Sequence, residues 1–386
     1  MRELLMIPGP VEFEEEVLRA LGAPSLSHTD PAFIVTFGRA LQRLREVCLA
    51  PSAQPFVVSG SGTLAMEMAV ANLVEPGDAA LVVNTGYFSD RMAKILERHG
   101  AKVTHVRASP GDAPTVEEVK THLERGGFKV MTVTHVDTST GVLTPVEGLV
   151  KAARALGVLS VVDGVCATAG EVFHQDAWGA DVYLTASQKA VGVPPGLALV
   201  TASPRAMEAW KGRKAPVASV YSDWAEWLPI MEAYAGGKPS YFATPPVNLV
   251  TALDVSLGQI LAEGMEARFA RHQRLARAFR AAWSALGLRL LPVSEAVTAN
   301  TLSAVYYPEG VDASLVGRVK AEGVVVAGGL HPDLKTRYFR VGHMNRVGPG
   351  DVLVTVGAVE RALLAAGHRA EAGAGLRAAE SVLAAR

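Results

Sequence analysis

The chain has 386 residues, of which 49% are hydrophobic and 19% are charged, with a formal net charge of -1 at pH 7. Its mean hydropathy of +0.22 is typical of a folded protein with a large core and excludes a chain that is disordered throughout. The near-zero charge argues against nucleic acid or anionic membranes as partners. No apolar run approaches the roughly 20 residues that span a bilayer.

The first residues of the chain and its cysteine content indicate the cellular compartment. Pro8-Gly9-Pro10 interrupts the first ten residues, which therefore lack the layout of a signal peptide. Cys48 and Cys166 are too few for a disulfide framework, and no CxxC spacing indicates zinc. We expect two buried thiols in a cytoplasmic protein.

Between residues 55 and 202, short apolar runs alternate with amphipathic stretches. In chain order the pattern predicts a strand at 56–58, a helix at 63–73, a strand at 79–83, a helix at 90–99, a strand at 130–134, a helix at 146–156 and strands at 158–162 and 181–186. Such alternation indicates an α/β fold with a mostly parallel central sheet covered by helices on both faces. Ligands of such sheets bind at the carboxyl ends of the strands.

After Pro245-Pro246 the pattern changes. Residues 247–286 are rich in Ala, Leu and Arg and predict a long, largely helical segment. Short strands are predicted at 304–306, 324–326 and 338–341, with a helix at 313–322 between them. This indicates a smaller C-terminal α+β domain. The tail 370–386 is expected to be a surface helix or a frayed end.

Two of the predicted strands end close to chemically useful side chains. Asp163 closes one apolar run, and Lys189 lies just past the next one. An acid and an amine at the same sheet edge suit pyridoxal phosphate. The amine would form a Schiff base with the aldehyde, and the acid would keep the pyridine nitrogen protonated. Alone, Asp163 could be a structural acid at a strand end, and Lys189 would more often be a surface lysine. The hypothesis therefore depends on their joint placement.

A turn rich in glycine precedes the helix predicted from Thr63. In Ser59-Gly60-Ser61-Gly62-Thr63, glycines allow close backbone approach, and the helix N-terminus offers free N–H groups to a phosphate. A plain helix cap is the alternative, which becomes the weaker interpretation once Asp163 and Lys189 are considered. The amide of Gln188 also suits a phosphate oxygen. The turn is not a dinucleotide fingerprint, because the second half of that motif is missing.

His135 and Asp137 raise the question of a metal site or a catalytic triad. They lie in Thr-His-Val-Asp-Thr-Ser-Thr-Gly, residues 134–141, and no third ligand is identified. We therefore favour a loop with side-chain caps and expect no metal.

Several motifs together resemble the class V aminotransferases, in particular the alanine–glyoxylate (serine–pyruvate) aminotransferase group. They cover about residues 4–366 and are, in order: Pro-Gly-Pro-Val-Glu-Phe (8–13), Gly-Ser-Gly-Thr (60–63), Thr-His-Val-Asp-Thr-Ser-Thr-Gly (134–141), Val-Val-Asp-Gly (161–164), Thr-Ala-Ser-Gln-Lys-Ala (185–190), Ser-Tyr-Phe-Ala-Thr-Pro-Pro (240–246), Ala-Gly-Gly (327–329) and Phe-Arg-Val-Gly-His-Met (339–344). The resemblance implies a fold-type I enzyme dependent on pyridoxal 5'-phosphate. It also implies an N-terminal arm (1–20) lining the active site, a large domain (21–262) and a small domain (263–386).

The resemblance also implies roles for individual residues. Lys189 would form the Schiff base with the cofactor and then move a proton, and Asp163 would pair with the pyridinium nitrogen. Arg340 would hold the substrate carboxylate, and the backbone of Gly9 would line the same pocket. The implied cofactor-binding set is Ser61, Gly62, Thr63, Phe88, Thr138, Asp163, Gln188, Lys189, Tyr241 and Thr244.

Within that set, Gly62, Thr63 and Gln188 would hold the phosphate, although some relatives have His at the position of Thr63. Phe88 would stack on the ring where several relatives have Trp. Thr138 would lie near the phenolic oxygen. Tyr241 and Thr244 match residues that reach the phosphate from the neighbouring subunit, so a homodimer with shared active sites is implied.

The activity that the resemblance implies is transfer of the amino group of L-alanine to glyoxylate, which forms pyruvate and glycine in two half-reactions. Serine–pyruvate, serine–glyoxylate or aspartate transamination stays open, although aspartate would need a further cation that no motif identifies. Cysteine desulfurase is disfavoured because Cys48 and Cys166 are misplaced for a mobile catalytic loop. A scaffold that has lost catalysis and a Rossmann oxidoreductase are the remaining alternatives.

Overall fold

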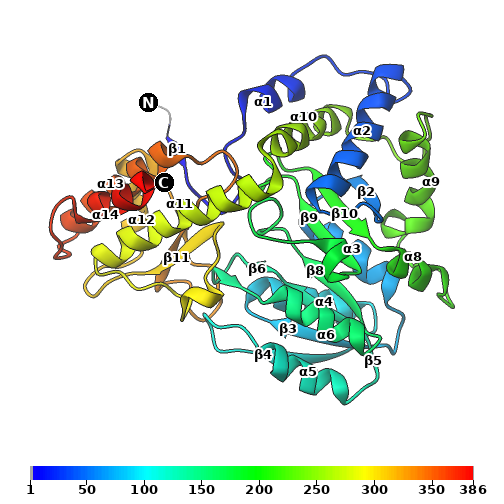
Figure 1. Ribbon diagram of the computed structural model, residues 1–386, viewed down its shortest axis with the longest axis horizontal. Helices are drawn as coiled ribbons and strands as arrows, with labels where there is room; N and C mark the ends of the chain where they lie inside the picture. Colours follow the sequence, from blue (N-terminus) through cyan, green and yellow to red (C-terminus); the bar gives the residue numbers. More distant parts are fainter. Residues whose placement is uncertain (1–2, 386) are drawn as a thin grey trace.

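A seven-stranded sheet forms the centre of the computed structural model, which describes residues 3–385 (Figure 1). Its strands run in the order β2-β10-β9-β8-β5-β3-β4. Only β10 is antiparallel to its neighbours, so the expected mostly parallel sheet is confirmed. The strands are β2 (Gln54–Ser59), β3 (Ala79–Asn84), β4 (Lys102–Arg107), β5 (Phe128–Thr134), β8 (Leu159–Asp163), β9 (Val182–Ala186) and β10 (Leu197–Ala202).

Helices connect and cover these strands, because each parallel connection must cross a face of the sheet. The structure confirms the predicted helices near residues 63–73, 90–99 and 146–156. The helices of this part are α1 (Glu15–Leu21), α2 (Pro31–Val47), α3 (Gly62–Leu73), α4 (Tyr87–Arg98), α5 (Val116–Glu124), α6 (Val146–Ala155), α7 (Gln175–Trp178), α8 (Pro204–Lys211), α9 (Trp224–Ala235) and α10 (Val247–Glu263).

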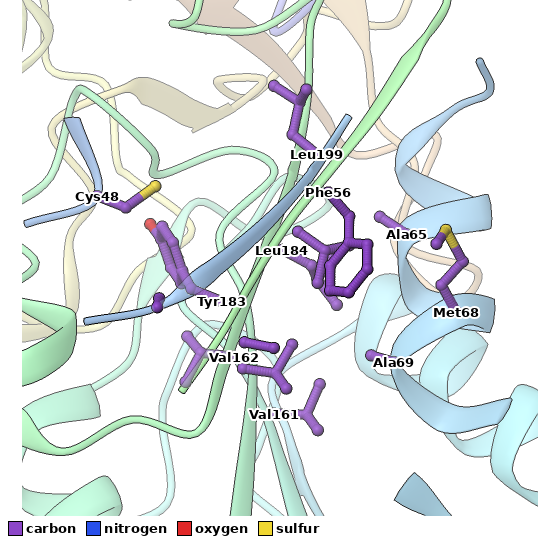
Figure 2. Close-up of a cluster of buried hydrophobic side chains, with 14 of the residues drawn as sticks. Cys48, Phe56, Ala65, Met68, Ala69, Val161, Val162, Tyr183, Leu184 and Leu199 are labelled. Carbon is purple, nitrogen blue, oxygen red and sulfur yellow. The ribbon is translucent and has the colours of Figure 1, made fainter. Parts of the chain in front are cut away.

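The core beneath the sheet edge is apolar on both faces. Successive side chains of a strand point to opposite faces. Leu184 therefore faces Ala65 and Met68 of α3, whereas Tyr183 points the other way, toward Cys48 (Figure 2). Cys48 and Cys166 are both buried and free, as expected.

The C-terminal part has its own apolar cluster, built around a three-stranded antiparallel sheet in the order β11-β14-β13. Its elements are α11 (Met265–Ala285), β11 (Leu302–Tyr306), α12 (Leu315–Ala321), β12 (Val324–Val325), β13 (Ala327–Gly328), β14 (Tyr338–Gly342), α13 (Pro349–Ala365) and α14 (Ala374–Ala384). The remaining short elements are β1 (Leu4–Leu5), β6 (Val136–Asp137), β7 (Val142–Leu143), and the 3-10 helices η1 (Val220–Ser222) and η2 (Glu295–Val297).

The first strand of the chain packs on this C-terminal part. β1 pairs in parallel with β12, and Met6 belongs to the C-terminal apolar cluster. Further along, Val11 N–H donates to the carbonyl of Gln188 at 3.1 Å. The N-terminal segment therefore runs from the C-terminal sheet to the loop that carries Lys189. The proposed division at residues 20 and 262 stays a prediction.

One detail differs from the sequence expectation. The long segment 247–286 is divided into α10 and α11, because Gly264 adopts φ +84°, which a helix cannot accommodate. Of the two expectations for the tail, the helix is confirmed: α14 lies against α11, with Ala379 fully buried (Figure 1). Arg386 lies outside the described residues. Between residues 3 and 385, no helix has the length and apolar character needed to cross a membrane.

Candidate active site

Asp163 and Lys189 lie at the same edge of the central sheet. β8 ends at Asp163, and β9 ends at Ala186, three residues before Lys189; the two strands are parallel neighbours. Both side chains are buried. The Lys189 ammonium donates to the carbonyl oxygen of Pro8. A Cβ on Gly9, which has φ +107°, would lie only 2.5 Å from Lys189 Cδ. Glycine at position 9 thus lets the N-terminal segment pass directly over the amine.

Burial perturbs both ionisable groups. Loss of hydration raises the pKa of Asp163 to about 7, although the Val165 N–H, 2.9 Å from Oδ1, acts in the opposite direction. The negative charge of Asp137 raises this pKa further, whereas the positive charges of Arg91 and Lys189 lower it. Burial lowers the pKa of Lys189. The site therefore holds an amine that releases its proton more readily than a surface lysine, close to an acid.

The Gly-rich turn leads into the N-terminus of α3. Ser61 is the N-cap residue, but its side chain makes no capping hydrogen bond. A Cβ on Gly62 would lie 2.8 Å from Val165 Cγ2, so the turn can pack against the loop after Asp163 only with glycine there. The side-chain oxygen of Gln188 is buried without a hydrogen-bond partner among residues 3–385. The free N–H groups of the helix start are suited to an anionic ligand. The Gln188 oxygen is an acceptor and needs a donor, so only the NH2 group of this amide can contact an anion.

The loop 134–141 positions the start of α4. Asp137 accepts hydrogen bonds from Ser139 N–H at 2.9 Å and from Phe88 N–H at 3.1 Å. Within the described part of the chain, no group of three His, Cys, Asp or Glu side chains could hold a metal ion. Burial lowers the pKa of His135 to about 3, so this imidazole is neutral. Asp137 is therefore a loop and helix cap, as favoured from the sequence.

Arg340 comes to the same site from the C-terminal sheet. Its Nε donates to Gly328 O at 2.9 Å, and its Nη1 donates to Thr138 O at 3.0 Å. No further hydrogen bond of its Nη2 is seen to residues 3–385. The guanidinium lowers the pKa of Lys189 electrostatically, after the larger effect of burial. The structure thus joins Lys189, Thr138 and Arg340, which are far apart in sequence.

Tyr241 and Thr244 lie on the outside of the chain. The Tyr241 side chain is 63% exposed, contacts the ring of His28 and lies 3.4 Å from the Thr244 hydroxyl. No hydrogen bond joins either residue to Lys189, Asp163 or Gln188. The predicted contribution of both residues to a neighbouring active site stays a prediction.

One residue of the site was missed in the sequence. Arg91 of α4 donates to the Thr63 hydroxyl at 3.0 Å, and its guanidinium lies 4.9 Å from the ring centroid of Phe88. Its position one helical turn after Phe88 could have indicated that both side chains lie on one face of α4. The pairing with Thr63 depends on the fold.

Together these residues fit pyridoxal phosphate. An acid stands at the sheet edge for the ring nitrogen and an amine for the aldehyde. The uncapped start of α3 and the amide NH2 of Gln188 would suit its phosphate. The fit therefore rests on the buried acid and amine at one sheet edge and on this helix start.

Known proteins share both the sequence and the fold. The family model Aminotransferase class-V matches residues 14–348. The alanine–glyoxylate aminotransferase 1 of Saccharomyces cerevisiae is 40% identical over 89% of this chain and 92% of its own length. The L-aspartate–glyoxylate aminotransferase of Paracoccus denitrificans is 34% identical over 97% and 95%.

A solved structure agrees. The alanine–glyoxylate aminotransferase of Nostoc sp. superposes with a TM-score of 0.88 at 34% identity, over 94% of this chain and 96% of that one. This confirms the fold-type I architecture. The chain belongs to the class-V aminotransferases, enzymes that depend on pyridoxal phosphate, and within them to the alanine/serine–glyoxylate group.

Proposed function

We propose that this aminotransferase moves the amino group of L-alanine to glyoxylate and releases pyruvate and glycine in two successive half-reactions. The observation that carries the proposal is the 40% identity to the yeast alanine–glyoxylate enzyme over 92% of its length. The yeast and Paracoccus relatives share glyoxylate in their names and differ in the amino donor. The acceptor is therefore better supported than the donor.

The buried amine is the group that moves the proton. Pyridoxal phosphate, when bound, supplies the carbonyl that takes up the amino group and a ring that accepts the electron pair from the substrate Cα. Lys189 is held beside the Pro8 carbonyl, and burial lowers its pKa, so it would be available as a neutral base for the substrate. Lys189 would take the proton from the substrate Cα and return it to the cofactor's reacting carbon.

Two further residues orient the reactants. The Asp163 carboxylate would hold a proton on the ring nitrogen, and its buried position keeps water from competing for it. Arg340 has two nitrogens fixed by carbonyl oxygens, which leaves Nη2 for a carboxylate. Pro8 and Gly9 cover Lys189 closely, which favours a small side chain on the substrate.

The assembly and setting are part of the same proposal. A homodimer would bring Tyr241 and Thr244, exposed on this chain, to the phosphate of the neighbouring active site. We place the enzyme in the cytoplasm, where its product would contribute to glycine biosynthesis.

An absorbance spectrum of the purified protein tests the proposal. L-alanine should shift the visible band of the bound cofactor to the near ultraviolet, and glyoxylate should restore it. If alanine has no effect but serine or aspartate shifts the band, the donor is wrong while the family stands. If glyoxylate does not restore the band and pyruvate does, the acceptor is wrong.

A further inference from the structure

Arg91 is a cation without an acidic partner. Within residues 3–385 no carboxylate lies within 4.0 Å of it as an ion pair, whereas the adjacent Asp90 pairs with Arg107. Its guanidinium instead binds two hydroxyl groups, Thr63 Oγ1 at 3.0 Å and Tyr87 Oη at 3.3 Å. Neutral acceptors do not balance its charge.

The position of Arg91 makes the lack of a negative counter-charge more unfavourable. Thr63 lies in the first turn of α3, where the helix dipole contributes a partial positive charge. A guanidinium held there is electrostatically unfavourable unless an anion joins it. The same guanidinium lies 4.9 Å from the ring centroid of Phe88, so Arg91 spans from the ring-stacking position to the anion site at the helix.

We propose that Arg91 is a direct ligand of the cofactor's phosphate, added to the helix N-terminus and Gln188. A dianion there would neutralise both the helix end and the guanidinium, and Nη1 could shift from the Thr63 hydroxyl to a phosphate oxygen. Arg340, in contrast, is bound to the Thr138 carbonyl and not to the helix start. The inference rests on the family's cofactor and is independent of the proposed donor and acceptor.

Equilibrium binding to the cofactor-free protein tests this assignment without using turnover. The dissociation constants of pyridoxal phosphate and of pyridoxal, which lacks the phosphate, are measured by tryptophan fluorescence for wild type, Arg91→Gln and Arg91→Lys. Loss of a charge-assisted contact should weaken pyridoxal phosphate binding by about 10- to 100-fold in Arg91→Gln and leave pyridoxal binding unchanged. Arg91→Lys should fall between.

Arg98→Gln is the matched control, because Arg98 lies exposed in the last turn of the same helix and loses the same charge. It should bind both compounds as wild type does. Because Thr63 is itself expected at the phosphate, Thr63→Val does not separate the two residues. Arg91→Lys, which keeps the charge, tests the assignment even if Arg91→Gln folds poorly: pyridoxal phosphate binding weakened selectively, but less than in Arg91→Gln, would support it. An unchanged ratio of the two constants in Arg91→Gln and Arg91→Lys would overturn it. So would an effect confined to the KM for aspartate, which would assign Arg91 to a substrate carboxylate.

Discussion

Two regions of the molecule hold buried and half-buried charged groups in opposite ways. At the cofactor edge (Asp163, Lys189, Arg91 and Arg340) the charges have no ion-pair partner among residues 3–385. At the junction of α10 and α11, the junction cluster (Glu263, Arg268 and Arg271) is fully paired: Glu263 accepts from both arginines at 2.5–3.0 Å.

The remaining donors of the junction cluster are used as well. Arg268 also donates to Ala169 O and Ala190 O, and Arg271 donates to Asn345 O, so the cluster ties the loops after Asp163 and Lys189 to the segment after β14. Charged groups whose hydrogen bonds and counter-charges are all satisfied, as in the junction cluster, stabilise the structure. Unsaturated buried charges cost stability and are retained where a ligand will complete them.

The largest effect is expected from removing the amine. Lys189→Ala should lower kcat by at least about 10²–10⁴-fold, the usual contribution of a placed general base. The unfolding free energy of the cofactor-free protein should not fall, because a buried amine with a lowered pKa is unfavourable. Single-turnover kinetics and thermal melts measure both, with Lys151→Ala as the surface control. Retention of more than a few per cent of activity would show that another group moves the proton.

Substitutions in the junction cluster should change the stability of the protein rather than its activity. Glu263→Gln leaves the buried Arg268 without its counter-charge and should cost about 3 kcal/mol of unfolding free energy. Urea denaturation measures it, and Glu266→Gln, on an exposed side chain in the first turn of α11, should change little. If Glu263→Gln were as stable as wild type while its activity collapsed, the cluster would belong to the catalytic machinery and the comparison would fail.

The two regions also differ in how far the sequence predicts them. Asp163 and Lys189 were predictable because apolar runs show where strands end, and neighbouring parallel strands end at one edge. Arg91 was not, because its partner Thr63 lies on another helix and only the packing of α3 on α4 joins them. Gly264 and the buried Arg268 were also missed, since a single glycine and an arginine are both tolerated within helices. Tertiary contacts place the two arginines, whereas the helix break at Gly264 is a local backbone feature.

The pH dependence of stability should have opposite signs in the two regions. Burial raises the pKa of Asp163 from 3.8 to about 7, so the folded, cofactor-free protein keeps a proton that the unfolded chain has lost. The stability linked to this group is present below pH 3.8 and is lost as the pH rises through 7, on the order of 4 kcal/mol in all. Glu171, whose pKa burial also raises to about 7, adds to the same slope.

Glu263 has the opposite linkage. Burial acts to raise its pKa, but the hydrogen bond from Arg271 and the charges of both arginines lower it below 4.5. Its stability is therefore present above pH 4.5 and is lost as the pH falls through the lower folded-state value. Urea denaturation of the cofactor-free protein from pH 4 to 8 should show a shallower decline in Asp163→Asn, whereas Glu263→Gln should keep that decline. Parallel curves for wild type and Asp163→Asn would contradict the raised pKa.

The smallest effect tests whether the free nitrogen of Arg340 serves a substrate. Arg340→Lys keeps the positive charge but loses the planar fork, two of whose nitrogens are fixed on Gly328 and Thr138 carbonyls. We expect the KM for alanine to rise about tenfold, equivalent to about 1.4 kcal/mol, with kcat reduced much less. Initial-rate kinetics measure the split, and Arg337→Lys, exposed near the start of the same strand, is the control. An unchanged KM would mean that the carboxylate binds elsewhere, and the unpaired charge of Arg340 would then need a different ligand.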